Sequence, residues 1–133
     1  MDNISNEKRS YNMSRIKSKN TSPEMIVRKF LFSHGFRYRL HVSSLPGTPD
    51  IVIRSRNKII NVNGCFWHMH SCKAGSYLPK TNSDFWKNKL ESNKFRDYKN
   101  IKKLKSENWD LLVIWECEVK SSQFKNIIMN FLS

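Results

Sequence analysis

The sequence predicts an α/β fold in which helices flank a mixed central sheet. Helix-like and strand-like hydrophobic patterns follow one another in the order helix, strand, strand, strand, helix, strand, helix. The run 109–115 (WDLLVIW) is almost continuously apolar, as expected of a central strand that is covered on both faces. A length of 133 residues is enough for one hydrophobic core but not for two.

The first helix is predicted to begin at Thr21. Thr21 and Glu24 have the spacing of a capping box, and Pro23 lies in the first turn. Gly35 is a good stop signal for this helix. Apolar and basic side chains then alternate over residues 36–40, which indicates a half-buried strand.

The middle of the chain predicts two more strands. A turn containing prolines, residues 45–49, precedes strands at 50–54 and 58–63, which a short polar hairpin joins. The chain leaves the second of these strands at Gly64 and continues through a loop to Asn82.

The last third of the chain predicts a long basic helix, the apolar strand and a final helix. The long helix is capped by Ser83 or Asp84 and runs to about Glu107, and an amphipathic helix covers residues 122–132. The lysines and arginines of the long helix surround an apolar stripe, made of Phe85, Leu90, Tyr98, Ile101 and Leu104.

The charge balance points to a polyanionic partner. Twenty-four Lys and Arg residues against 11 Asp and Glu residues give a net charge of +13, and such basicity favours binding to phosphates with release of counterions. Anionic membranes and acidic proteins are alternative partners, and a lysine-rich composition from an AT-rich genome would also explain the charge. Residues 1–20 are polar and basic, so we expect an N-terminal arm that orders on its partner, followed by a single domain at 21–133.

Localisation is predicted to be cytoplasmic. The N-terminus lacks the apolar stretch of a signal peptide, and no apolar run approaches the roughly 18 residues of a membrane span. The three cysteines are an odd number, which in a reducing compartment favours metal ligation over a disulfide framework.

All three cysteines can serve one metal site. Cys65, His70 and Cys72 lie within eight residues, and Cys117 follows the late apolar strand. Three thiolates and one imidazole suit a tetrahedral Zn²⁺ site, and four protein ligands make such a site structural. In the alternative interpretation Cys117 is a small core residue and the other two cysteines are incidental.

A carboxylate and an imidazole are predicted to meet at one end of the sheet. Asp50 begins one strand, and the next strand leads directly to His68. A carboxylate that coordinates Mg²⁺ and an imidazole that deprotonates a metal-bound water suffice for phosphodiester hydrolysis. Taken alone, Asp50 is equally well explained as a turn-capping residue after Pro49.

Aromatic side chains surround this segment. Phe66 and Trp67 lie inside the short Cys/His turn and Trp86 on the long helix. Large flat side chains beside a basic surface can wedge between base pairs. Burial in the core is the alternative, and it applies more to Trp86, on an amphipathic helix, than to Trp67.

These motifs resemble the very-short-patch repair (Vsr) DNA mismatch endonucleases along nearly the whole chain. The Gly-Cys-Phe-Trp-His and Leu-Pro-Gly-x-Pro-Asp motifs, with the late Trp-Glu-Cys, are highly specific. The matching blocks are residues 9–16, 44–50, 64–72, 85–86 and 115–117. The resemblance implies a fold like that of type II restriction endonucleases.

The resemblance also implies an activity and a substrate. The enzyme would nick one strand of double-stranded DNA on the 5′ side of the thymine in a T:G mismatch, which arises when 5-methylcytosine deaminates. Mg²⁺ would be the catalytic cofactor and Zn²⁺ the structural one. We expect a monomer in the bacterial cytoplasm, associated with the nucleoid, that can hand nicked DNA to other repair proteins.

Catalytic roles follow from the resemblance position by position. Asp50 is similar to the family's Mg²⁺-binding aspartate and His68 to its catalytic histidine. Glu24 and Asp97 match a glutamate and an aspartate placed near the active site. The backbone carbonyl of Val62 would supply a second contact to the metal.

The remaining matched residues bind zinc or DNA in the family. The aromatics that intercalate beside the mismatch correspond to Phe66, Trp67 and Trp86, and Met13 matches a residue of the N-terminal arm that inserts from the opposite groove. The family's zinc ligands correspond to Cys65, His70, Cys72 and Cys117.

One catalytic position departs from the family pattern. A second active-site histidine often precedes the Gly-Cys-Phe-Trp block, and this chain has Asn63 there. Asparagine donates hydrogen bonds but cannot act as a base at neutral pH. The departure predicts reduced activity or a different use of the metal-bound water, and it keeps open a rival function, a zinc-braced module that binds mismatched or distorted DNA with weak or no cleavage. A related nuclease that cuts a different DNA structure is a further alternative.

Overall fold

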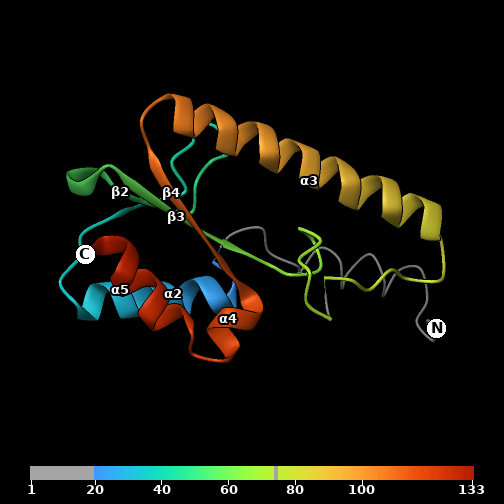
Figure 1. Ribbon diagram of the computed structural model, residues 1–133, viewed down its shortest axis with the longest axis horizontal. Coiled ribbons are helices and arrows are strands. Elements are labelled where there is room, and N and C mark those ends of the chain that lie inside the picture. The colour runs from blue at the N-terminus through green and yellow to red at the C-terminus, as the bar shows by residue number, and fades with distance from the viewer. Residues whose placement is uncertain (1–19, 74) are drawn as a thin grey trace.

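The computed structural model describes residues 20–73 and 75–133 and confirms a mixed sheet between helices (Figure 1). The sheet has four strands, in the spatial order β1 (Arg39–Leu40), β2 (Ile51–Ile53), β3 (Lys58–Asn63) and β4 (Asp110–Trp115). β2 pairs antiparallel with β1 and β3, whereas β3 and β4 are parallel. The predicted N-terminal arm, with Met13, lies outside the described residues.

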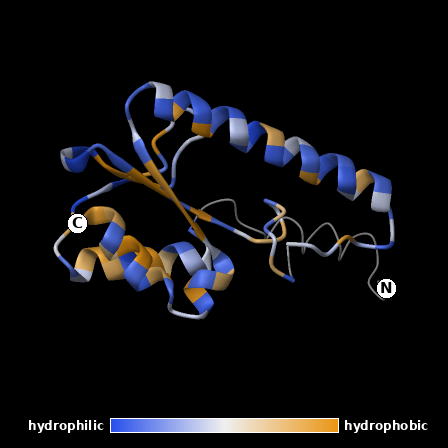
Figure 2. Cartoon of the chain, viewed as in Figure 1, coloured by the Kyte–Doolittle hydropathy of each residue, from blue (hydrophilic) through white to orange (hydrophobic). Residues whose placement is uncertain are grey.

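Helices cover both faces of the sheet. One face carries α3 (Ser83–Ser106), and the other carries α2 (Ser22–Ser33), α4 (Glu116–Lys120) and α5 (Phe124–Leu132) (Figure 1). Hydrophobic residues concentrate in the strands and in α2 and α5, whereas α3 is mostly hydrophilic (Figure 2). No helix in the described part of the chain is both long and apolar enough to cross a membrane.

The core is divided by the sheet into two unequal clusters. The larger cluster joins Leu31 of α2 and Ile128 of α5 to Ile114 of β4. The smaller cluster packs Leu104 of α3 against Val52 and Ile59. Burying these side chains contributes about 1.5–3 kcal/mol each, so the larger cluster holds α2, α4 and α5 on one face of the sheet.

Helix α2 begins where its capping signal predicts. The Thr21 hydroxyl accepts a hydrogen bond from the Glu24 N–H at 3.4 Å, as an N-cap residue does. Only half of the predicted capping box forms, because the Glu24 carboxylate accepts the N–H of Asn20, at 3.1 Å, instead of that of Thr21. Gly35, two residues after Ser33, has φ 81°, a left-handed conformation that glycine adopts without strain.

The prediction that residues 109–115 form a central strand is wrong. β4 is an edge strand and pairs only with β3 among the described residues. Its two faces are nevertheless covered as predicted, with Leu112 and Ile114 in the larger cluster and Leu111 in the smaller one. The continuous apolar run is therefore explained by helices that cover both faces of β4, and not by a neighbouring strand on each side.

Several local predictions also differ from the structure. The strand at 36–40 is reduced to Arg39–Leu40, and the hairpin contains a 3₁₀ turn, Arg54–Arg56. The N-cap of α3 is Asn82, with φ 56°, instead of Ser83 or Asp84. Helix α4 was not predicted. It contains Cys117, which therefore lies in a helical turn directly after β4.

The predicted apolar stripe of α3 is only partly buried. Leu90 and Leu104 are buried, at 2% and 1% exposure. Phe85 and Tyr98 are instead 59% and 62% exposed. Helix α3 extends beyond the sheet at its N-terminal end (Figure 1), so no strand lies beneath that end to cover Phe85.

Candidate active site and metal centre

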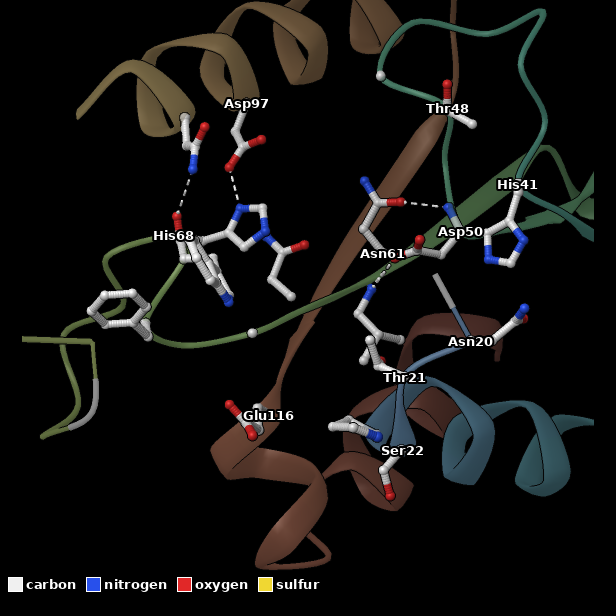
Figure 3. A pocket seen from close by; sticks show the side chains of 18 of the residues that line it. Asn20, Thr21, Ser22, His41, Thr48, Asp50, Asn61, His68, Asp97 and Glu116 are labelled. Atoms are coloured by element: carbon white, nitrogen blue, oxygen red, sulfur yellow. Dashed lines mark hydrogen bonds and ion pairs between the residues drawn. The ribbon is translucent and has the colours of Figure 1, made fainter. Parts of the chain in front are cut away.

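A cleft of about 900 Å³ opens where β3 ends. Its walls come from the start of α2, the segment before β2, the loop after β3, the middle of α3 and Glu116 at the start of α4 (Figure 3). Ile51 faces Ile60 in the antiparallel register, which places Asp50 beside the last residues of β3. His68 lines the same cleft, so both residues lie at one end of the sheet, as the strand order predicted.

Asp50 is held against the backbone of β3. Its Oδ2 accepts the Val62 N–H at 2.9 Å, and its own N–H donates to Asn61 Oδ1 at 3.0 Å (Figure 3). Burial is the main cause that raises the pKa of Asp50 from 3.8 to about 6, and the nearby charge of Glu24 adds to it. The Val62 N–H and the nearby His41 and His68 act in the opposite direction. A desolvated carboxylate of this kind gains from a cation beside it.

His68 is oriented by a carboxylate on α3. Its Nδ1 contacts Asp97 Oδ2 (Figure 3), and the two side chains are 27% and 31% exposed. The ring of Trp115 meets His68 edge-on, with 6.3 Å between ring centroids. A carboxylate at Nδ1 fixes the proton there and leaves Nε2 able to accept one. This arrangement suits a general base facing the cleft.

Glu24 and His41 form a second polar pair beside Asp50. The Glu24 side chain is 2% exposed, and His41 Nε2 lies 2.8 Å from its Oε2. Arg28 Nη1 lies 3.4 Å from the same oxygen. One donor atom from each of Glu24, His41 and Asp50 lies within 4.8 Å of the others. Glu24 is therefore placed close to Asp50, as expected, and His41 is an additional member.

The cysteines and His70 gather on the other side of the loop after β3. The parallel register pairs Asn63 with Trp115, so the segments that follow β3 and β4 start side by side. Consequently Cys117 comes close to His70, with 3.6 Å between its Sγ and the His70 Nδ1. The His70 ring stacks on Trp115 at a centroid separation of 4.2 Å.

The donor set fits a tetrahedral zinc ion. Donor atoms of Cys65, His70, Cys72 and Cys117 all lie within 4.8 Å of one another, and sulfurs bound to one zinc at about 2.3 Å lie about 3.8 Å apart. Burial raises the pKa of the Cys65 thiol to about 12, and the sulfurs of Cys72 and Cys117 add to this shift. The Cys65 N–H donates to Glu116 Oε1 at 3.4 Å, and Glu116 also lines the cleft.

Comparison with known proteins identifies the family. The family model described as "DNA mismatch endonuclease Vsr" matches residues 1–74. The chain belongs to the Vsr family of DNA mismatch endonucleases.

Curated relatives match across most of the chain. The "Type II nicking enzyme V.XorIIP" of Xanthomonas oryzae pv. oryzae is 48% identical over 89% of this chain and 86% of its own length. The "Type II nicking enzyme V.NmeAIP" of Neisseria meningitidis is 45% identical over 90% of this chain and 85% of its own. The "DNA mismatch endonuclease Vsr" of Escherichia coli is 35% identical over 86% and 73%.

The aromatic residues of this Vsr-family protein form one continuous cluster. Ring centroids of Phe66, Trp67 and Trp86 lie 5.1–5.7 Å apart. Sequence reasoning missed two neighbours, Tyr77 at 6.4 Å from Phe66 and Phe85 at 5.4 Å from Trp86. Both are 59% exposed, so the cluster presents aromatic surface to solvent beside the cleft. Trp67 and Trp86, for which burial in the core was the alternative, are both half-buried.

The remaining predicted residues fall into two groups. Val62 and Asn63 line the cleft with Asp50, and their contacts to a metal or a phosphate stay predictions. Met13 lies outside the described residues. His41 was not predicted as a site residue, because a polar residue after an alternating strand has no pattern that distinguishes it from other edge residues.

Proposed function

We propose that this Vsr-family protein is a Mg²⁺-dependent endonuclease that nicks DNA on the 5′ side of the thymine in T:G mismatches arising from 5-methylcytosine deamination. One observation carries the proposal. Asp50 and the His68–Asp97 pair face one cleft beside an aromatic cluster whose outer rings, Tyr77 and Phe85, are exposed. The protein would have a fold like that of type II restriction endonucleases. It would act as a monomer on the nucleoid in the bacterial cytoplasm.

Asp50 and the Val62 carbonyl would hold the Mg²⁺ ion. When bound there, Mg²⁺ would offset the negative charge on the attacked phosphate and on the leaving oxygen. The cleft suits an oxygen-preferring cation, since it contains a desolvated carboxylate with a second carboxylate, Glu24, nearby. Asn63 at the cleft wall would donate a hydrogen bond to a phosphate oxygen.

His68 would accept the proton of the attacking water at Nε2. Asp97 keeps the other ring nitrogen protonated and stabilises the imidazolium that forms. The water would then attack the phosphate in line with the oxygen that leaves. This assignment gives His68 the catalytic contact and makes Asp97 its positioning residue.

The aromatic cluster and the basic helix would engage the duplex. Phe66, Trp67 and Trp86 would insert beside the mismatch, where unstacking costs less than in paired DNA. Arg96 lines the cleft on α3 and would contact a phosphate. The arm at residues 1–20 would order on DNA, with Met13 entering from the other groove.

A zinc ion at the cysteine cluster would brace this interface. Cys65, His70 and Cys72 lie in the loop that also carries Phe66, Trp67 and His68, and Cys117 ties that loop to the end of β4. Four protein ligands leave no open position for substrate. The ion would therefore stabilise the loop without taking part in hydrolysis.

End-labelled duplexes that carry one T:G pair test the proposed function. We expect Mg²⁺-dependent nicking only of the thymine strand, 5′ of the mismatch, and loss of nicking in Asp50→Ala. Asp110→Ala is the matched control, because Asp110 has a side chain 65% exposed and pairs with Lys58. Unchanged nicking by Asp50→Ala would show that the chemistry is misassigned.

A non-cleaving DNA-binding module is the second candidate, and Asn63 favours it because this side chain cannot act as a base. Tight binding of the T:G duplex without cleavage in Mg²⁺ or Mn²⁺ would select it. Equal rates on T:G and fully paired duplexes would instead select a nuclease for another DNA structure. The names of the relatives, "mismatch endonuclease" and "nicking enzyme", support cleavage.

A further inference from the structure

His41 occupies a strained position at the wall of the cleft. It follows β1 directly and has φ 47°, a left-handed conformation that costs a residue with a Cβ about 1 kcal/mol or more. Its N–H donates to the Asp50 carbonyl at 3.0 Å, so the strained turn is fixed to the residue that precedes β2. Figure 3 shows the imidazole beside Asp50. Strain of this kind persists where surrounding contacts require it.

The side chain of His41 lies among hard oxygen donors. Its Nε2 is 2.8 Å from Glu24 Oε2, close to the spacing of about 3 Å between neighbouring ligands of an octahedral ion with bonds of about 2.1 Å. Donor atoms of His41, Glu24 and Asp50 all fall within 4.8 Å of one another. The three side chains come from separate segments, and all three are at least half-buried. One cation can therefore contact all three with little movement.

We propose that His41 is a nitrogen ligand of the cation in this cleft, so that the site binds Mn²⁺ more tightly than Mg²⁺. The inference rests on the proposed function, in which Asp50 holds the cation. Imidazole suits transition ions, whereas Mg²⁺ prefers oxygen donors. Coordination through Nε2 would replace the hydrogen bond to Glu24 and use the neutral tautomer, in which the ring proton lies on Nδ1. The mixture of nitrogen and oxygen donors distinguishes this site from a magnesium site made of carboxylates alone.

A purely structural role for His41 makes a different prediction. As a hydrogen-bond partner of Glu24 alone, His41 would affect Mg²⁺ and Mn²⁺ binding equally. His41→Gln retains a donor for Glu24 but removes the nitrogen ligand, so it separates the two roles. His34→Gln is the matched control, because His34 is an exposed histidine at the end of α2 whose Nδ1 contacts the Phe30 carbonyl.

The experiment titrates Mn²⁺ and Mg²⁺ into the full-length protein of measured zinc content by calorimetry. We expect His41→Gln to weaken Mn²⁺ binding about 10-fold or more and Mg²⁺ binding less than about 3-fold, with no change in His34→Gln. Equal changes for the two ions, or none, would overturn the inference. Circular dichroism verifies that each variant is folded.

Pulsed electron paramagnetic resonance of bound Mn²⁺ detects a nitrogen ligand directly. We expect a nitrogen coupling in the parent protein and in His68→Ala, and its loss in His41→Gln. Mn²⁺ bound in an Asp50-dependent way without nitrogen coupling would refute the His41 ligand while leaving the proposed function intact. Mn²⁺ binding and T:G nicking that both survive Asp50→Asn would refute the assignment of the cation to Asp50. A parent protein that does not nick T:G duplexes in Mg²⁺ or Mn²⁺ would refute the proposed function itself.

Discussion

The cysteine cluster and the acidic cleft are built from the same loop but differ in donors and in access. The cysteine cluster collects three sulfurs and one imidazole, and Cys65 is 1% exposed. The cleft collects carboxylates and imidazoles and opens into a volume of about 900 Å³, and each group has one buried member with the others half-buried. Soft donors that surround an ion completely hold a structure together, whereas hard donors beside an open cleft leave room for substrate.

The loop after β3 separates the two environments residue by residue. His68 points to the cleft and contacts Asp97 (Figure 3), whereas His70, two residues later, stacks on Trp115 and lies 3.6 Å from Cys117. Met69 between them has φ 53°, a left-handed conformation that reverses the chain locally. This difference predicts that replacing His68 affects nicking, whereas replacing His70 affects metal binding and stability.

Removal of a cysteine ligand is expected to have the largest effect. Cys117→Ala should reduce zinc from about one ion per chain to near zero and lower the free energy of unfolding by several kcal/mol, because metal binding is linked to folding when ligands come from distant segments. Elemental analysis and thermal denaturation measure both. Ser121→Ala, an exposed change after the same helix, serves as the control. A folded, stable Cys117→Ala protein without metal would refute the bracing role.

Loss of the positioning carboxylate should affect only the cleft. Asp97→Asn should lower the nicking rate on the order of 100-fold, because general-base catalysis supplies about 10²–10⁴-fold and depends on the orientation of His68. Zinc content and affinity for T:G DNA should not change. Asp97→Asn combined with His68→Ala should be no slower than His68→Ala alone. Additive losses in the double variant would mean that Asp97 acts independently of His68.

The aromatic cluster should contribute to binding more than to hydrolysis. Trp86→Ala should weaken binding to a T:G duplex by about 1–3 kcal/mol, the usual loss of one aromatic–base stack, and fluorescence anisotropy measures it. Phe32→Ala is the control, because Phe32 is 77% exposed on α2, outside the cluster. If both variants bind like the parent, Trp86 does not contact the mismatch.

The smallest expected effect is a gain in stability. The pKa of Asp50 in the folded protein is raised to about 6 from 3.8, so the folded state binds this proton more tightly than the unfolded state. The ionised carboxylate therefore destabilises the fold increasingly as pH rises from about 4 through 6. Asp50→Asn should raise the free energy of unfolding at pH 7.5 by about 1–3 kcal/mol, and with it the melting temperature, and both increases should be smaller at pH 5. A lower melting temperature at pH 7.5 would contradict this account.

Local signals made most of the fold predictable from the sequence. The cap at Thr21 and the strands at β2 and β3 follow from residue pattern and turn chemistry over a few positions. The edge position of β4 was not predictable, because an apolar run reports covered faces and says nothing about neighbouring strands. Helix α4 has only five residues, Glu116–Lys120, too short for a clear helical period.

The site was predictable where strand topology brings residues together. Adjacent strands carry Asp50 and the loop with His68 to one end of the sheet, and parallel pairing of β3 with β4 brings Cys117 to the other cysteines. The position of His41 depends on a left-handed backbone conformation. The position of Tyr77 depends on how a loop folds back onto Phe66. Neither leaves a periodic trace in the sequence.

The division between His68 and His70 is the central claim, and one paired measurement tests it. Zinc content and T:G nicking are determined together for His68→Ala and His70→Ala. We predict that His68→Ala keeps about one zinc ion per chain and its melting temperature but loses nicking, whereas His70→Ala loses zinc and stability. Parental nicking by His68→Ala, or parental zinc content and stability in His70→Ala, would contradict the account.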